Sequence, residues 1–166
     1  MFKTLKNAQR GFTIIELLIV IAIIAILAGL VLNNFQGAQA KARDTQRVTD
    51  TNNVHSKLEE YYNENGAYPG DLDTNADNSL TAADFPGIDA ESLSDPDGNA
   101  IVSNAAVADA TAANAVANPD TDDEYIYIPY PTGCTDDCTG YVLKAFIERP
   151  NDNTTNPYVK LGLNNN

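Results

Sequence analysis

The sequence predicts an α+β protein in which one long N-terminal α-helix packs on a small antiparallel β-sheet. Three observations predict this fold class. Residues 12–32 are almost entirely apolar, residues 33–65 place apolar side chains at helical spacing, and the last 42 residues contain short runs of β-prone residues. The helix is therefore expected to have a transmembrane first half and an amphipathic second half, followed by a globular head.

The apolar run from Phe12 to Leu32 has the length of a transmembrane helix. Of its 21 residues 18 are apolar, and Glu16 is the only charged one. At about 1.5 Å per residue, a helix of this length spans roughly 31 Å, which matches the hydrocarbon core of a bilayer. Three basic residues and no acidic residue precede the run. The positive-inside tendency therefore predicts a cytoplasmic N-terminus and an exported head.

Two simple interpretations of this run are a cleavable secretory signal and a plain transmembrane anchor. A cleavable secretory signal has an apolar region of only about 7–15 residues before its cleavage site, and this run is longer. A plain transmembrane anchor fits the length but leaves Glu16 unexplained. A carboxylate within such a helix costs a few kcal/mol and is by default a candidate for function.

The segment from Arg10 to Glu16, with the sequence RGFTIIE, is followed by about sixteen apolar residues. It resembles the class III signal of type IV prepilins and pseudopilins. The resemblance implies that a prepilin peptidase cuts between Gly11 and Phe12 and then N-methylates Phe12. Residues 1–11 would then be a leader peptide.

The resemblance also gives Glu16 a role in assembly. After cleavage, Phe12 carries a cationic amine at the edge of a region of low dielectric constant. Pairing that amine with Glu16 of a neighbouring subunit would neutralise both charges, each of which is costly to bury alone. The pairing would also set the axial register of the helices in a filament.

Residues 33–65 are predicted to continue the helix to about residue 64. Asn65 and Gly66 supply a helix stop, and Pro69 follows. The stretch from Tyr61 to Pro69 resembles the tyrosine-rich helix end and turn of bacterial pilins. Many members of the family have a proline where this chain has Leu32-Asn33-Asn34, and here only Gly29 weakens the helix, by about 1 kcal/mol. The expected packing face comprises Phe35, Ala38, Ala42, Val48, His55, Leu58 and Tyr62.

The head, residues 66–166, holds 17 acidic and three basic residues. Residues 70–124 are rich in turn formers and are predicted to form an insert, whereas residues 125–163 contain three strand-like runs at 125–128, 141–147 and 158–161. These runs are expected to form the antiparallel sheet, with the helix supplying one wall of a thin core. The alanine-rich stretch 100–117 is either a short surface helix or a loose insert.

Residues 73–84 match most of the EF-hand calcium loop, with oxygen ligands at loop positions 1, 3, 5, 9 and 12. Asn78 replaces the turn glycine, and an aspartate replaces the terminal glutamate, which shortens its reach. The alternative is a solvated acidic turn. The candidate calcium ligands are Asp73, Asn75, Asp77, Ser79, Thr81 and Asp84.

Two further motifs lie in the head. The segment from Asp95 to Asn99 partly resembles a D-P-x-G-N turn of major pseudopilins, but the residues that flank it in that family are missing, which favours an ordinary tight turn. Cys134 and Cys138 enclose three residues between the first two strand-like runs. Outside the cytoplasm this pair is predicted to form a disulfide that stiffens a hairpin tip.

The chain shows no nucleophile–base pair, phosphate loop or metalloenzyme motif, so we expect it not to be an enzyme. Its net charge of −13 makes nucleic-acid binding through the head unlikely on electrostatic grounds. The resemblance implies a structural pilus subunit that assembles with copies of itself, starting in the cytoplasmic membrane and ending at the cell surface. The implied partners are the prepilin peptidase, an assembly ATPase and a platform protein.

Two alternatives to the pilus subunit remain open. The chain could be a pseudopilin of a type II secretion system, which acts as a piston. It could also be a membrane-tethered calcium- or ligand-binding module that never polymerises.

Overall fold

The computed structural model describes residues 12–72, 87–119, 125–151 and 154–164. The chain divides into two compact units, residues 1–39 and residues 40–166, which we call the stem and the head unit.

The helix α1 runs from Ile14 to Asn65, which confirms the long helix predicted from the sequence. Its first part belongs to the stem. The large apolar side chains there are exposed, from Ile14 at 80% to Leu30 at 65%. By length and composition, α1 is the one helix of the described chain that could cross a membrane.

The end of α1 follows the predicted stop signal. The N–H of Gly66 donates to the carbonyl of Tyr62 at 2.7 Å, and Gly66 has a φ of +78°. This left-handed conformation is strained for a residue with a Cβ, so glycine suits the helix end. The chain then turns back, and Tyr68 pairs with Cys138 through two backbone hydrogen bonds.

The head unit contains a four-stranded sheet with the order β1-β2-β3-β4. Its strands are β1 (Val102–Ser103), β2 (Ile126–Tyr130), β3 (Gly140–Ala145) and β4 (Tyr158–Leu161). The last three pair in antiparallel fashion, as predicted, but β1 pairs in parallel with β2, so the sheet is mixed. The insert thus contributes a strand that was not predicted, because two residues are too few to show a periodic pattern.

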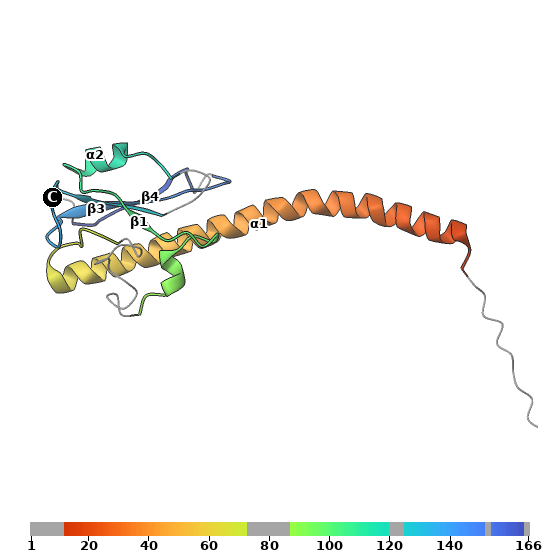
Figure 1. Ribbon diagram of the computed structural model, residues 1–166, viewed down its shortest axis with the longest axis horizontal. Helices are drawn as coiled ribbons and strands as arrows, with labels where there is room; N and C mark the ends of the chain where they lie inside the picture. Colours follow the sequence, from red (N-terminus) through yellow and green to blue (C-terminus); the bar gives the residue numbers. More distant parts are fainter. Residues whose placement is uncertain (1–11, 73–86, 120–124, 152–153, 165–166) are drawn as a thin grey trace, which may run out of the picture. The chain divides into compact units, whose positions relative to one another are not determined.

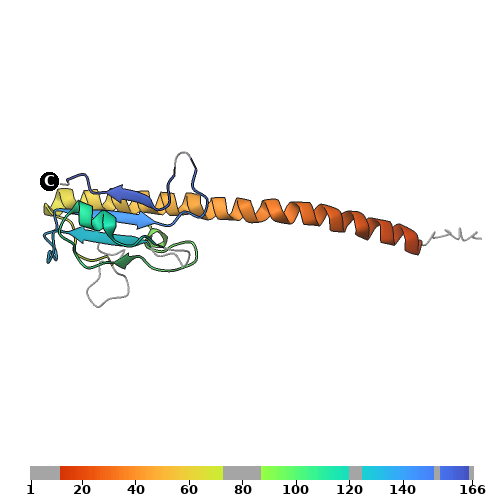
Figure 2. The same cartoon turned by 90° about the horizontal axis from the view of Figure 1, so that it is seen from above.

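One face of the sheet packs on the second part of α1 (Figure 2). Val54 and Leu58 of the helix enter the main hydrophobic cluster, so the helix does supply a wall of the core. The alternating side chains of Tyr127, Tyr141 and Leu143 come from the sheet to the same cluster.

The opposite face of the sheet is covered by the helix α2 (Ala110–Ala115) (Figure 1). Ala113 of this helix packs on Ile128, Tyr130 and Val142 in a second, smaller cluster. The carboxylate of Asp109 caps α2 by accepting from the N–H of Ala112 at 2.9 Å. Of the two interpretations of residues 100–117, the short surface helix is therefore correct.

The buried face of α1 differs from the apolar face that we predicted. Phe35, Ala38 and Ala42 are exposed, and Val48 and His55 are only half-buried. The side chains that are buried, at spacings of three and four residues, are mostly polar in the first turns of the head unit. They are Ala40, Asp44, Arg47, Asp50, Thr51, Val54 and Leu58. Of the predicted face, Leu58 is buried and Tyr62 packs against the core, so the prediction is correct toward the end of the helix. It is wrong over the first turns of the head unit, where charged partners from the head neutralise a buried polar stripe.

Candidate functional site

The stem begins with a reciprocal cap between Thr13 and Glu16. The Glu16 carboxylate accepts from the backbone N–H of Thr13 at 2.8 Å and from its hydroxyl at 2.7 Å. In return, the backbone N–H of Glu16 donates to the Thr13 hydroxyl oxygen at 3.3 Å. This is a capping box, and its T-x-x-E spacing is a local sequence signal that we did not use to predict the start of the helix.

The cap fixes Glu16 in the first turn of α1, four residues after Phe12. A carboxylate in this position is favoured by the partial positive charge at a helix N-terminus. The Phe12 side chain is 87% exposed. Of the predicted processing residues, Gly11 lies outside the described residues, so the structure adds nothing about the bond between Gly11 and Phe12.

In the head unit, an ionic cluster joins α1 to the segment after β3. The carboxylate of Glu148 accepts two hydrogen bonds from Arg43, at 2.7 and 2.6 Å, and a third from Arg47 at 2.7 Å. Arg47 is only 1% exposed and lies 5.9 Å from the ring centroid of Phe146. We call Arg43, Arg47, Asp44 and Glu148 the head anchor. These hydrogen bonds from arginine lower the pKa of Glu148 to about 2.

Asp44 completes the head anchor through the backbone. Its carboxylate accepts from the N–H groups of Glu148 and Arg149 at 2.8 and 2.9 Å, and lies 3.3 Å from the guanidinium of Arg47. The anchor therefore ties a stretch of α1 to a segment about a hundred residues later. The predicted packing face contained no charged side chain of this stretch, and the sequence carries no local signal for the pairing.

The segment from Asp95 to Asn99 is a tight turn closed by its own side chain. The Asp95 carboxylate accepts from the N–H groups of Asp97 at 3.1 Å and Asn99 at 2.7 Å. Gly98 has a φ of +93°. This is the ordinary tight turn that the sequence favoured.

The predicted calcium loop, residues 73–84, lies outside the described residues. Within the described ranges, no group of three or more His, Cys, Asp or Glu side chains is placed to hold a metal ion. The structure therefore leaves the calcium hypothesis, with its six candidate ligands, as a prediction.

The predicted disulfide joins Cys134 and Cys138. It closes the loop between β2 and β3, and the pairing of Tyr68 with Cys138 ties this loop to the chain just after α1. Gly70 lies so close to the backbone of Thr135 that a Cβ atom at that position would overlap with it. The disulfide loop is therefore fixed on both sides.

The single histidine is part of a half-buried hydrogen-bond network. Nδ1 of His55 lies 2.7 Å from the Tyr141 hydroxyl, and the hydroxyls of Tyr141 and Tyr68 donate to Glu59 at 3.2 and 2.9 Å. Burial lowers the pKa of His55 and raises that of Tyr141. These contacts join α1 to the sheet, so His55 belongs to the packing of the head.

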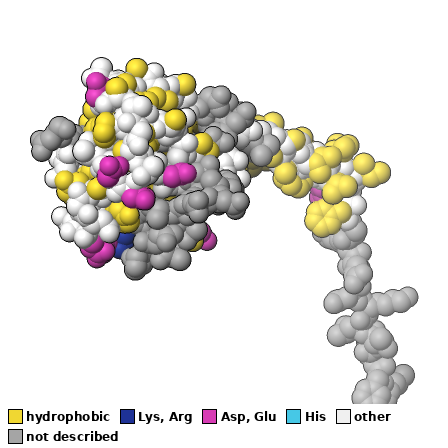
Figure 3. All heavy atoms as spheres, turned by 60° about the vertical axis from the view of Figure 1, so that its left-hand side comes forward, with side chains coloured by type: hydrophobic (Ala, Val, Ile, Leu, Met, Phe, Trp, Pro, Cys, Tyr) yellow, Lys and Arg dark blue, Asp and Glu magenta, His cyan; other side chains and the backbone are white. Residues whose placement is uncertain are grey.

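The two units present different surfaces. Figure 3 shows acidic side chains spread over one face of the head unit, whereas apolar side chains dominate the described stem. In the stem, Glu16 is the only acidic residue.

Comparison with known proteins finds relatives of the N-terminal part of the chain. A family model described as a prokaryotic N-terminal methylation motif matches residues 6–32. The fimbrial protein EcpC of Eikenella corrodens is 40% identical over 67 residues, which cover 40% of this chain and 44% of that protein. The type II secretion system core protein G of Dickeya chrysanthemi is 38% identical over 65 residues, or 39% of this chain and 42% of that protein.

A further relative is the type IV major pilin protein PilE of Neisseria gonorrhoeae. It is 39% identical over 67 residues, which cover 40% of each chain. The chain thus spans less than half the length of the curated relatives that it matches. No solved structure matches it.

Proposed function

Because the chain belongs to the family of type IV pilins and type II secretion pseudopilins, we propose that it is a structural subunit of a type IV pilus. The observation that carries the proposal is the exposed apolar surface of the stem, interrupted by one acidic side chain at its first turn. Exposure of such a surface to water is unfavourable, and no described residue of the chain buries it. A bilayer covers it before assembly, and the stems of other copies cover it in a filament.

Processing converts the membrane-bound precursor into the subunit that enters the filament. We infer that a prepilin peptidase removes residues 1–11 and methylates Phe12, while the head lies outside the cytoplasmic membrane. An assembly ATPase and a platform protein then move the stem from lipid into the filament. The amine of Phe12 meets Glu16 of a neighbouring copy, and the pair is neutral in the filament core. The role is mechanical, with no catalytic step.

A second candidate is a pseudopilin of a type II secretion system. Several relatives are core proteins G of such systems, and they are as similar to this chain as the pilins are. The two roles differ in the length and place of the fibre: a pilus is a long surface fibre, and a pseudopilus is short and periplasmic.

Electron microscopy of sheared surface fibres tests the proposal, combined with mass spectrometry of their subunits. We expect long fibres whose subunit begins with N-methylated Phe12. Processed protein that stays in the envelope in short fibres would favour the pseudopilin. Unpolymerised protein that binds calcium tightly would instead identify a membrane-tethered binding module.

A further inference from the structure

The head unit has very few basic side chains that can reach a partner. Residues 40–166 hold 22 acidic and seven basic residues. Arg43 and Arg47 are engaged in the head anchor, and Lys57 donates to Glu60 at 2.6 Å. Lys144 is buried beneath α2, and Lys160 lies over the ring of Tyr158. The basic residues that remain are Lys41 and Arg149.

Lys41 and Arg149 are both exposed and line the same groove, of about 180 Å³. One wall is a stripe of α1 formed by Lys41, Thr45 and Thr49, at intervals of four residues. The other wall is the segment after β3, where Asn151 and Thr154 pair through two backbone hydrogen bonds. We call this the basic groove.

The one acidic side chain among the described lining of the basic groove, Asp44, does not neutralise Lys41 and Arg149. The Asp44 side chain is only 10% exposed. Its carboxylate already accepts from two backbone N–H groups and lies beside Arg47. Within the part of the chain that the structure describes, neither Lys41 nor Arg149 forms an ion pair. Among the described residues that line it, the groove therefore presents two cations to its surroundings.

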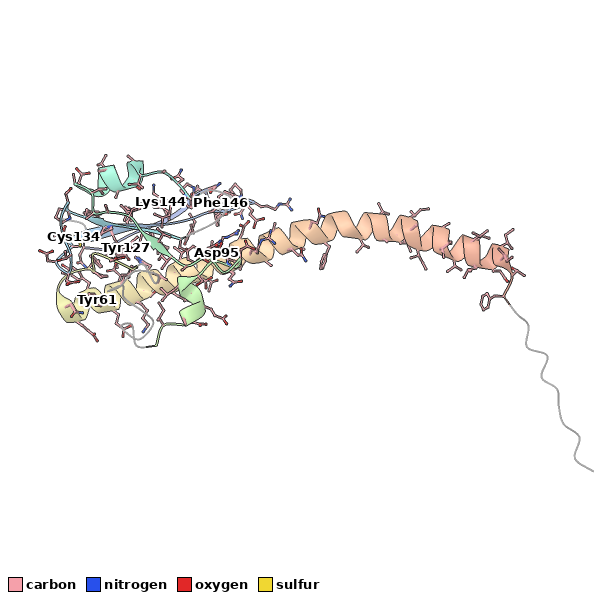
Figure 4. The ribbon with its side chains drawn as sticks, in the orientation of Figure 1. Tyr61, Asp95, Tyr127, Cys134, Lys144 and Phe146 are labelled. Carbon is pink, nitrogen blue, oxygen red and sulfur yellow. A yellow bond between two sulfur atoms is a disulfide. The ribbon has the colours of Figure 1, made fainter. Side chains whose placement is uncertain are left out.

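The opposite end of the head unit is acidic. Asp136 and Asp137 are exposed in the disulfide loop, and Glu64 is exposed in the last turn of α1. Figure 4 shows Cys134 and Tyr61 at this end and Phe146, three residues before Arg149, toward the other. Along α1, the 23 residues from Lys41 to Glu64 correspond to about 35 Å. The basic groove and the acidic disulfide loop thus lie toward opposite ends of the head unit.

We propose that the basic groove binds the acidic disulfide loop of a second copy of this chain, with Lys41 and Arg149 facing Asp136 and Asp137. This inference rests on the proposed function, because it concerns contacts between heads in a polymer. A contact between two different surfaces of one chain is heterologous, and its repetition builds a ring if the rotation closes or an open helical filament if it does not, never a two-fold dimer. In the proposed polymer the stems set the open, helical arrangement. The charges fix the direction and register of the heads, and the apolar stems supply the main driving force.

The disulfide holds the acidic loop in place before binding, and the head anchor does the same for the backbone at Arg149. The loop with Asp136 and Asp137 is closed by the disulfide and tied to Tyr68, so little entropy is lost when it binds. Arg149 is held through its backbone N–H by Asp44. Both surfaces are therefore fixed before they meet.

Charge reversal in the full-length chain, expressed in cells that assemble it, tests the proposal. We expect the double variant Lys41→Glu/Arg149→Glu to lower the yield of sheared filaments at least tenfold. Adding Asp136→Lys and Asp137→Lys to the same chain should restore most of the yield, because each groove then meets a loop of opposite charge. Lys160→Glu, which changes a basic residue outside the groove, should leave the yield within twofold.

Zero-length carbodiimide cross-linking of wild-type filaments gives a second readout. Mass spectrometry should find Lys41 linked to Asp136 or Asp137, and the link should join one heavy-isotope and one light-isotope subunit in mixed filaments. Wild-type yield from the double variant, or failure of the four-residue swap to rescue it, would overturn the contact while leaving filament assembly in place. Absence of filaments from the wild type would instead overturn the proposed function.

A membrane surface is the other anionic partner that the groove could meet. If it bound lipid headgroups, the double variant would reduce binding of the full-length chain to vesicles containing anionic lipid, and the swap would not restore filaments. That result would also overturn the contact between heads. Equal thermal unfolding midpoints of the variants and the wild type would show that the heads are folded.

Discussion

The stem and the head unit differ in how far their large apolar side chains are exposed. The described stem exposes its large apolar side chains, whereas the head unit buries most of its own in two clusters on the two faces of one sheet. The same helix serves both units. From Leu17 to Val31 it is apolar on all sides, and in the head unit it buries one stripe that includes Asp44, Arg47 and Asp50.

The difference shows which unit is complete without a partner. Burial of apolar area contributes about 25 cal/mol per Å², and the stem can gain this only from lipid or from other chains. The head unit already has its core, its disulfide and its ion pairs. Changes in the stem should therefore affect assembly with little effect on folding, and changes in the head core should do the reverse.

The largest expected effect comes from Glu16→Ala in the stem. We expect no filaments, because the amine of Phe12 would have no counter-charge in the filament core. The peptidase cut after Gly11 and the thermal unfolding of the head should be nearly unchanged. Filament counts by electron microscopy and the N-terminal peptide by mass spectrometry check this. Normal filaments from this variant would remove Glu16 from the assembly mechanism.

In the head unit, Glu148→Gln should cost about 2 kcal/mol of unfolding free energy. Arg43 loses its charged partner, whereas Arg47 keeps Asp44 and Asp97. Chemical denaturation of the full-length protein in detergent measures the loss. The folded-state pKa of Glu148 is about 2, below its usual 4.5. Its stabilisation is therefore complete above about pH 4.5 and is lost as the pH falls toward 2. The difference between variant and wild type should shrink over that range, and a difference independent of pH would contradict the ionic role.

Lys144→Met tests the outer face of the sheet. The Lys144 ammonium donates to the carbonyls of Asn114 and Val116 at 2.9 and 2.8 Å, at the C-terminal end of α2. Losing these bonds should cost about 2 kcal/mol and speed hydrogen exchange in α2 first. Lys160→Met is the matched control and should change stability by less than about 0.5 kcal/mol. Equal effects of the two substitutions would show that the α2 bonds add nothing.

The smallest expected effect is that of calcium on the head. If residues 73–84 bind calcium with a dissociation constant near 1 mM, then 10 mM calcium should stabilise the head by about 1.4 kcal/mol. Thermal melting with calcium, against magnesium at equal ionic strength, measures the shift. The variant Asp73→Asn/Asp77→Asn should abolish it. No shift in the wild-type protein would leave the solvated turn as the correct interpretation of this loop.

The sequence predicted what depends on neighbours in the chain. The boundaries of α1, the strands β2, β3 and β4 and the disulfide loop all follow from signals within a few residues, such as Asn65-Gly66 at the helix end. The capping box of Thr13 and Glu16 is equally local and could have been recognised from its spacing.

The structural features that the sequence did not predict, apart from the capping box, depend on partners that are distant along the chain. The parallel strand β1 is defined by its pairing with β2, more than twenty residues later. The packing face predicted for α1 contained no Asp, Arg or Lys, because charged side chains are seldom fully buried unless they are paired. Nothing near Arg47 in the sequence indicates that Glu148 will neutralise it.

The sequence by itself determined that this chain has an apolar stem with one glutamate, a match to the N-terminal methylation motif over residues 6–32, and an acidic head after it. These properties follow from composition and spacing, which are local. Only the tertiary structure decided that the head is anchored to α1 through buried charges and that its exposed cations gather in one groove. Ion pairs between side chains a hundred residues apart form only when the fold brings them within a few ångströms, because Coulomb attraction in water is weak at longer range.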